Sequence, residues 1–315
     1  MRDKEKIWKQ LLAAERDARV SKFIKWLRHP ILYPLLMSFD YAVYPFTRRS
    51  ILFRVQTFFG KKLWTRLPAG TDIALHAIKA HDSEIRLSKF ICLHLNEGDT
   101  FIDVGAHYGY YTLLAAVLIG QRGHVYAIEA SAATSQTLLS NTAGEPRVTV
   151  HQAAASDAAG EILFYEYPGP YAEWNTTVKD AYKGQAWLKK IPQMENRVPA
   201  ILLDDLIHEK GISTAMIKID AEGGELGVIR GLTKSMPTHE LTIMMEYHRA
   251  LGPEITLHQK AATLLKENGY HSFVIQSDGT FRPIQDIDTH LLNAGLDSDN
   301  LVFMPSASAT ISESK

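Results

Sequence analysis

The residues with the clearest chemical meaning are two glycines and two acids close together in the sequence. The run FIDVGAHYGYYT places Asp103 at the end of an apolar stretch, and Gly105 and Gly109 bracket the tight turn that follows. Glycine permits the turn and the close approach of a ligand, and the helix expected next begins with unpaired N–H groups. A second apolar run, VYAIE, ends in Glu129. In an open α/β sheet, an acid at this point binds the two ribose hydroxyls of a nucleotide, so the pattern predicts an adenosine-bearing cofactor.

The spacing of the turn indicates which adenosine cofactor to expect. A dinucleotide-binding turn needs G-x-G-x-x-G so that a pyrophosphate can rest on backbone amides. Here His107 occupies the place of the second glycine. Asp103 is poorly placed for a pyrophosphate but suits a ligand with a cationic amine and a sulfonium. The sequence therefore favours S-adenosylmethionine, with an NAD-dependent oxidoreductase as the alternative.

Three blocks of the chain resemble the FkbM-type methyltransferases, a branch of the class I S-adenosylmethionine-dependent enzymes. The most specific is K-x-D-x-E-G-x-E at the end of a strand. The blocks are residues 101–141, residues 200–206 with 216–231, and residues 243–248. Two positions depart from the family: His107 replaces an Asn and Ala130 replaces a Pro. The resemblance implies methyl transfer to a hydroxyl of a sugar, glycan or related small molecule. It also implies that Ala155, Ser156 and Asp157 lie beside the adenine, where Ser156 or Asp157 can hydrogen-bond its amino group.

The candidate catalytic residues follow two strands expected to be neighbours. Asp220 ends the strand expected at 215–220 and Glu222 follows it, and His248 follows the strand expected at 241–247. Lys218 shares strand parity with Asp220, so the two side chains can pair. Acids and an imidazole at adjacent strand ends form a typical active-site arrangement. A hydroxyl acceptor must lose a proton, and we rank the bases as Asp220, then His248, then Glu222. Together with Glu246 these groups could hold a divalent cation, but a hydrogen-bonded scaffold is favoured and no metal is predicted.

Strand and helix signals alternate from residue 100 onward, which is typical of a mostly parallel sheet covered on both faces. We expect a Rossmann-like class I methyltransferase sheet at 67–305 that ends in an antiparallel C-terminal hairpin, and a disordered tail at 306–315. The strands are expected at 100–104, 124–129, 147–151, 215–220, 241–247, 271–275 and 300–304, and the helices at 84–95, 110–118, 132–141, 222–233 and 257–268.

An aromatic-rich segment at 160–199 interrupts this alternation. It is either the wall that contacts the acceptor, since aromatic faces stack on sugar rings, or an excursion that packs on the sheet edge. Its aromatic residues are Tyr165, Tyr167, Tyr171, Trp174, Tyr182 and Trp187.

The N-terminal part differs in charge from the rest. Residues 1–66 hold 15 Lys or Arg and 5 Asp or Glu, whereas the whole chain of 315 residues has a net charge of −1. The overall balance gives no nucleic-acid signature. We expect a helical extension that begins with one helix at 3–28. It either packs on the catalytic domain or a dimer partner, or lies on an anionic membrane.

Compartment signals are sparse. The charged N-terminus has no apolar signal core, and no stretch reaches the ~20 apolar residues of a spanning helix. The one cysteine, Cys92, lies in the apolar run FICLHL, where a core role is expected, and it allows no disulfide within the chain. These features favour a cytoplasmic protein with peripheral membrane contact through residues 1–66 as an open alternative. No pattern sets an oligomeric state.

Overall fold

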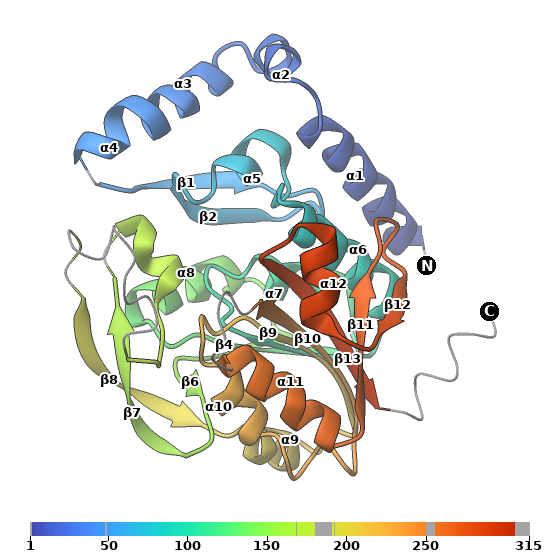
Figure 1. The fold of residues 1–315 in the computed structure, drawn as a ribbon. Helices are drawn as coiled ribbons and strands as arrows, with labels where there is room; N and C mark the ends of the chain where they lie inside the picture. The colour runs from blue at the N-terminus through green and yellow to red at the C-terminus, as the bar shows by residue number, and fades with distance from the viewer. Residues whose placement is uncertain are drawn as a thin grey trace.

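A computed structural model describes residues 2–47, 49–167, 169–179, 191, 193–249 and 256–305. Its centre is an eight-stranded sheet (Figure 1) with the order β12 (Phe281–Ile284), β11 (Tyr270–Ile275), β13 (Ser298–Pro305), β10 (Glu240–His248), β9 (Thr214–Ile219), β3 (Thr100–Val104), β4 (His124–Ile128) and β5 (Val148–His151). The five strands from β10 to β5 run parallel, and β13 is antiparallel to both of its neighbours. The carboxyl ends of these five strands therefore meet at one edge, where side chains that follow them can converge.

Helices cover both faces of the sheet, as its continuous apolar strands require. One face packs against α1 (Arg2–Ala18), α6 (Asp82–His94) and α7 (Tyr110–Leu118). The other packs against α9 (Leu203–Lys210), α10 (Glu225–Arg230), α11 (Leu257–Glu267) and α12 (Ile287–Ala294). The helix α8 (Ala132–Thr142) places Leu138 in a small separate cluster with Ala106 and Ala127. The expected α/β class and its strand positions are confirmed.

The C-terminal end of the sheet is more elaborate than the sequence predicted. β11 and β13 are antiparallel neighbours as expected, but they do not form a hairpin. Both β12 and α12 lie between them in the chain, and the hairpin is the β11–β12 pair. The stretch between the apolar runs 271–275 and 300–304 contains too few hydrophobic residues for its sequence to indicate a strand.

The N-terminal extension is only partly helical, so the expected organisation of residues 1–66 is wrong in two respects. The first helix is broken after α1, because Ser21 caps a second helix, α2 (Lys22–Arg28). After α3 (Leu32–Ser38), the π-helical turn η1 (Phe39–Val43) and α4 (Tyr44–Thr47), the chain forms an antiparallel hairpin, β1 (Ile51–Gln56) and β2 (Lys62–Leu67). A short helix, α5 (Thr71–His76), then leads to the main domain.

The side chain of Asn141 ties the hairpin to the main domain. The Asn141 amide accepts a hydrogen bond from the Trp64 N–H at 2.7 Å and donates to the Trp64 carbonyl at 2.9 Å. It also donates to the Tyr108 carbonyl at 2.8 Å. Asn141 therefore fixes β2 against the glycine turn.

The segment at 160–199 forms a second, smaller sheet beside the main one (Figure 1). β6 (Ala154–Ala155), β8 (Met194–Ile201) and β7 (Gly160–Glu166) lie in that order, and the 3-10 helix η2 (Gly169–Trp174) follows β7. Tyr182, Trp187 and the tail at 306–315 lie outside the described residues. No helix in the described part of the chain has the length and apolar composition needed to cross a membrane.

Candidate active site

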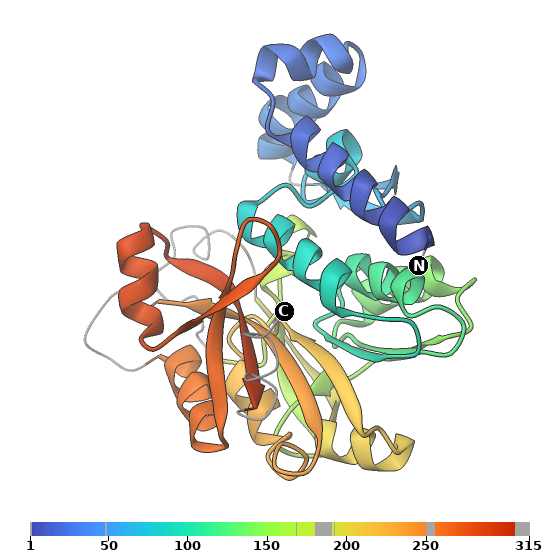
Figure 2. The same cartoon turned by 90° about the vertical axis from the view of Figure 1, so that its right-hand side faces the viewer.

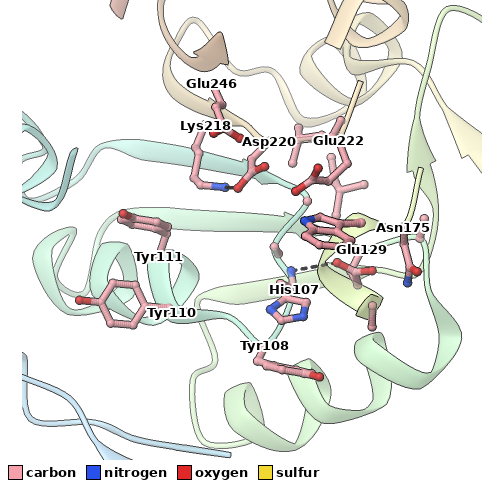
Figure 3. A pocket seen from close by; sticks show the side chains of 18 of the residues that line it. His107, Tyr108, Tyr110, Tyr111, Glu129, Asn175, Lys218, Asp220, Glu222 and Glu246 are labelled. Atoms are coloured by element: carbon pink, nitrogen blue, oxygen red, sulfur yellow. Dashed lines mark hydrogen bonds and ion pairs between the residues drawn. The ribbon is translucent and has the colours of Figure 1, made fainter. Parts of the chain in front are cut away.

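A cavity of about 810 Å³ lies at the carboxyl ends of the parallel strands (Figure 3). The turns after β3, β4 and β9 form its floor, and Leu63 and Thr65 of β2 contribute from the N-terminal extension. Phe164, Trp174 and Asn175 of the 160–199 segment line it as well. The N-terminal extension and the 160–199 segment therefore both contribute to the site, in addition to the ends of the parallel strands.

The glycine turn brings the backbone close to the cavity. Gly105 has φ +71°, and a Cβ there would meet the Asp220 carbonyl oxygen at 1.8 Å. Gly109 has φ +87°, and its Cβ would meet Leu138 Cδ1 at 2.6 Å. Only Gly105 lines the cavity. The two glycines thus serve different purposes, one joining the ends of β3 and β9 and the other letting α7 pack on α8.

Glu129 is held rigidly at the cavity wall although it is only 8% exposed. One carboxylate oxygen accepts the N–H of His107 at 2.9 Å (Figure 3). The other accepts the N–H of Ser131 at 2.9 Å. Burial raises the pKa of this carboxyl to about 7, against the opposing effect of the two backbone donors. Glu129 therefore changes charge near neutral pH.

Asp103 lies behind the cavity. It is 1% exposed, and it accepts a hydrogen bond from the Thr112 hydroxyl at 2.6 Å. Lys218 Nζ lies 3.8 Å from its other oxygen. Burial raises the pKa of Asp103, an effect that the positive charge of Lys218 partly offsets. Its contacts in the structure are with the protein, and its predicted contact with the cofactor stays a prediction.

Asp220 faces the cavity and pairs with a buried lysine, as its strand parity predicted. Lys218 Nζ donates to its carboxylate at 3.1 Å. Burial opposes the negative charge, but Lys218 and Lys79 outweigh that effect and hold the pKa of Asp220 below its usual range. Asp220 is therefore ionised at neutral pH.

Two further acids converge on Asp220. Carboxylate oxygens of Asp220, Glu222 and Glu246 lie within 4.8 Å of one another, and all three residues line the cavity. Glu222 has φ +49°, which fixes it in a tight turn. His248 contacts Glu246 at 3.4 Å but does not line the cavity, so it is not part of this group. The hydrogen bond to Glu246 raises the pKa of His248.

One of the three residues implied to lie beside the adenine, Ala155, lines the cavity. Ser156 and Asp157 do not line the cavity, and Asp157 instead pairs with Arg230 at 3.6 Å. The residues immediately before them, Ala153–Ala155, do line it. Sequence reasoning also missed Lys79 and Glu84, which line the cavity and pair at 3.0 Å. Both lie in the segment between the extension and the first strand, where no motif marked them.

The residues present fit an adenosine ligand. The wall offers an acid for ribose hydroxyls at Glu129, small apolar residues at 153–155 for a flat ring, and the Gly105 backbone. In addition, the buried Nε2 of His107 has no hydrogen-bond partner among the described residues. Burial lowers the pKa of His107 to about 3, so the ring is neutral and can donate or accept one bond to a ligand.

Comparisons with known proteins identify the family of the chain. The FkbM methyltransferase domain matches residues 103–272. A hexuronic acid methyltransferase, AglP of Haloferax volcanii, is 26% identical over 160 residues, which cover 50% of this chain and 59% of that protein. Among solved structures, a methyltransferase FkbM from Methylobacillus flagellatus has a TM-score of 0.40 at 14% identity, over 89% of this chain and 60% of that one. A SAM-dependent O-methyltransferase from Thermotoga maritima has a TM-score of 0.37 at 14% identity, over 80% of this chain and 77% of that one. The chain belongs to the FkbM methyltransferase family, a branch of the class I enzymes whose cofactor is S-adenosylmethionine.

Proposed function

We propose that this protein is an O-methyltransferase that transfers the methyl group of S-adenosylmethionine to a hydroxyl of a sugar or glycan. The observation that carries the proposal is the ionised Asp220 carboxylate, which faces the same cavity as the ribose-binding candidate Glu129. A cavity of about 810 Å³ can hold a cofactor and a small acceptor together.

The cofactor half of the cavity would be formed by Glu129 and its neighbours. Glu129 would accept hydrogen bonds from two ribose hydroxyls while the backbone N–H groups of His107 and Ser131 keep its carboxylate in place. The adenine ring would lie against residues 153–155. Asp103 would act through Lys218 and Thr112, because its carboxylate is directed at these two residues. Contacts of Ser156 and Asp157 with the adenine stay predictions.

Asp220 would act on the acceptor. When bound, S-adenosylmethionine supplies an electrophilic methyl group on a sulfonium. A hydroxyl hydrogen-bonded to the Asp220 carboxylate is oriented for an in-line approach, and its proton passes to that carboxylate. Lys218 keeps the carboxylate ionised and pointed into the cavity. We rank Glu222 next among the bases, and His248 last because its side chain lies outside the cavity lining.

A sugar acceptor is supported by the remaining lining residues and by the relative in Haloferax volcanii, a hexuronic acid methyltransferase. Glu222 and Glu246 offer carboxylate oxygens, which accept hydrogen bonds from vicinal hydroxyls. Trp174 and Phe164 lie on the same cavity and offer apolar faces. Polar acceptors beside aromatic faces are the combination that polyhydroxylated rings need.

The proposal is tested by incubating the protein with S-adenosylmethionine labelled with ¹³C in the methyl group and with a panel of neutral sugars, hexuronic acids and oligosaccharides. New O-methyl carbon signals by NMR, absent with Asp220→Asn, are the expected result. Transfer only to nitrogen or carbon acceptors, or none to any sugar in the panel, would overturn the hydroxyl and sugar assignment.

A further inference from the structure

The helix α2 carries large apolar side chains and buries none of them. Its sequence is KFIKWLR, and no residue of the helix is buried. Phe23 is 67% exposed, and Trp26 and Leu27 are about half exposed. A helix with this composition gains most of its stability by covering its apolar side chains. The apolar side chains of α2 therefore have no cover among the described residues.

The exposed side chains continue along the next helices. We call residues 22–47, which span α2 to α4, the arm. Among the described residues, 11 of the 16 exposed large hydrophobic side chains lie in the arm and the first two residues of β1. Those 11 are Phe23, Ile24, Trp26, Leu27, Ile31, Leu35, Tyr41, Val43, Phe46, Ile51 and Leu52. Concentrations of this kind mark an interaction surface, whereas single exposed apolar residues do not.

The arm has a separate inner side that packs on the protein. Leu36, Phe39 and Tyr44 form a buried cluster with Leu67 of the hairpin and Leu75 of α5. This cluster gives the arm its own attachment. The exposed side chains take no part in that attachment, so a partner can contact them.

Charge indicates what that partner is. The arm holds Lys22, Lys25 and Arg28 against a single acid, Asp40, and Arg49 and Arg54 follow it. Arg28 pairs with Asp17 of α1. Lys22 and Arg49 are exposed beside the apolar side chains. Basic residues mixed with exposed aromatic and aliphatic ones are typical of segments that lie in the interface of an anionic bilayer.

The place of the arm in the molecule also fits contact with a bilayer. Figures 1 and 2 show the arm at one end of the molecule, projecting beyond the sheet in both views. A flat surface can thus approach the arm without meeting the C-terminal half of the protein. We propose that the arm is a membrane-docking surface that lies on a bilayer containing anionic lipid.

Two other occupants fit less well. A second copy of the chain across a two-fold axis would place this basic surface against itself, and like charges would oppose the contact. A nucleic acid would use the basic groups and the aromatic rings, but it would leave aliphatic side chains such as Ile31, which is 82% exposed, without a partner.

Flotation of the full chain with vesicles tests the proposal. One set of vesicles contains equal parts of phosphatidylcholine and phosphatidylglycerol, and the other contains phosphatidylcholine alone. We expect flotation with the anionic vesicles, weaker flotation in high salt, and little with the neutral ones. The double variant Lys22→Gln/Arg49→Gln should lose about fivefold in partitioning for each charge removed. Trp26→Ala/Phe46→Ala should abolish flotation.

Matched controls separate docking from unfolding. Leu292→Ala removes an exposed apolar side chain outside the arm, and Lys266→Gln removes an exposed charge outside the arm. Both variants should float as the wild type does. Binding of S-adenosylmethionine by Trp26→Ala/Phe46→Ala shows that the variant is folded. Absence of wild-type flotation would overturn the proposal. So would a wild-type dimer in light scattering that Trp26→Ala/Phe46→Ala converts to a monomer, because the arm would then be the interface between two copies.

Discussion

The Cα of Gly105 lies so close to the backbone carbonyl of Asp220 that a Cβ on residue 105 would come within 1.8 Å of that oxygen. The ends of β3 and β9, which carry the cofactor turn and the proposed base, are thus in direct contact. Gly105→Ala must separate them and must also adopt a positive φ. We expect this variant to lose both cofactor binding and activity and to unfold at a lower temperature. Gly144→Ala, at an exposed position with nothing within 4 Å, should leave all three unchanged.

The second prediction concerns the ribose site. Glu129→Gln removes the charge from the proposed acceptor of two hydroxyl hydrogen bonds, each worth about 1.5–3 kcal/mol when the acceptor is charged. We expect titration calorimetry to show at least about a 100-fold loss of affinity for S-adenosylmethionine and S-adenosylhomocysteine. Glu161→Gln, at an exposed acid on β7, should bind normally. Tight binding by a folded Glu129→Gln protein would refute the ribose assignment.

The pKa of Glu129 predicts how affinity depends on pH. Because burial raises this pKa to about 7, much of the free protein holds a protonated Glu129 in slightly acidic solution. The ionised form is the better acceptor for ribose hydroxyls. Cofactor affinity should therefore rise about tenfold from about pH 6 to about pH 8 and then level off. A flat affinity profile for the wild type over this range would contradict the prediction, and Glu129→Gln should lack the rise.

The third residue to test is the base. Asp220→Asn keeps the shape of the side chain but removes the proton acceptor, so turnover should fall about 100-fold or more. Affinity for S-adenosylmethionine should change little, because Asp220 is assigned to the acceptor. His248→Gln, at a half-exposed side chain outside the cavity lining, should keep most of the activity. The reverse ranking in single-turnover assays would transfer the role of base to His248.

The free energy of unfolding should depend on a second acid with a raised pKa, Glu225. It is 1% exposed at the start of α10, where one oxygen accepts the N–H groups of Ala221 and Gly223, and burial raises its pKa to about 7. A raised pKa adds stability below the unfolded value of 4.5, and that contribution is lost as pH rises through 7. Glu225→Gln avoids the buried charge and keeps an acceptor for both N–H groups.

Denaturant titrations should therefore find Glu225→Gln more stable than the wild type by about 2–3 kcal/mol near pH 8, with the gain vanishing near pH 4.5. His258 lies 3.3 Å from the carboxylate, but burial lowers its pKa to about 4, so no ion pair is lost near neutral pH. Glu267→Gln, on the exposed side of α11, should show no gain at either pH. A destabilised Glu225→Gln protein near pH 8 would contradict the assignment.

Much of the core was predictable because its signals are local. Each parallel strand is a short apolar run, and the turn after β3 carries glycine where the backbone needs positive φ. The same turn also distinguished S-adenosylmethionine from NAD, because His107 takes the place of a glycine that a pyrophosphate-binding turn needs. The FkbM methyltransferase family of the chain confirms this prediction. The Lys218–Asp220 pair followed from strand parity alone.

The rest depends on contacts between distant parts of the chain. Leu63 and Thr65 line the cavity only because the hairpin folds across it, and Asn141 holds that hairpin through a bond to Trp64. Nothing in the composition of residues 51–67 distinguishes such a hairpin from the helix that was expected. Likewise, Ala153 and Ala154 offer no polar group that a motif search could detect, and Ala155 was reached only through the family resemblance.

The β1–β2 hairpin has two neighbours at once. Leu67 packs with the arm residues, while Leu63 and Thr65 on the same strand border the cavity. One strand therefore borders both the membrane-docking surface and the cavity. Any coupling between binding at these two places is equal in both directions. Whatever factor a bilayer applies to the affinity for an acceptor, the acceptor must apply in return to the affinity for the bilayer. If docking on a bilayer raises the affinity for an acceptor, bound substrate lengthens the residence of the enzyme at that surface and product release shortens it.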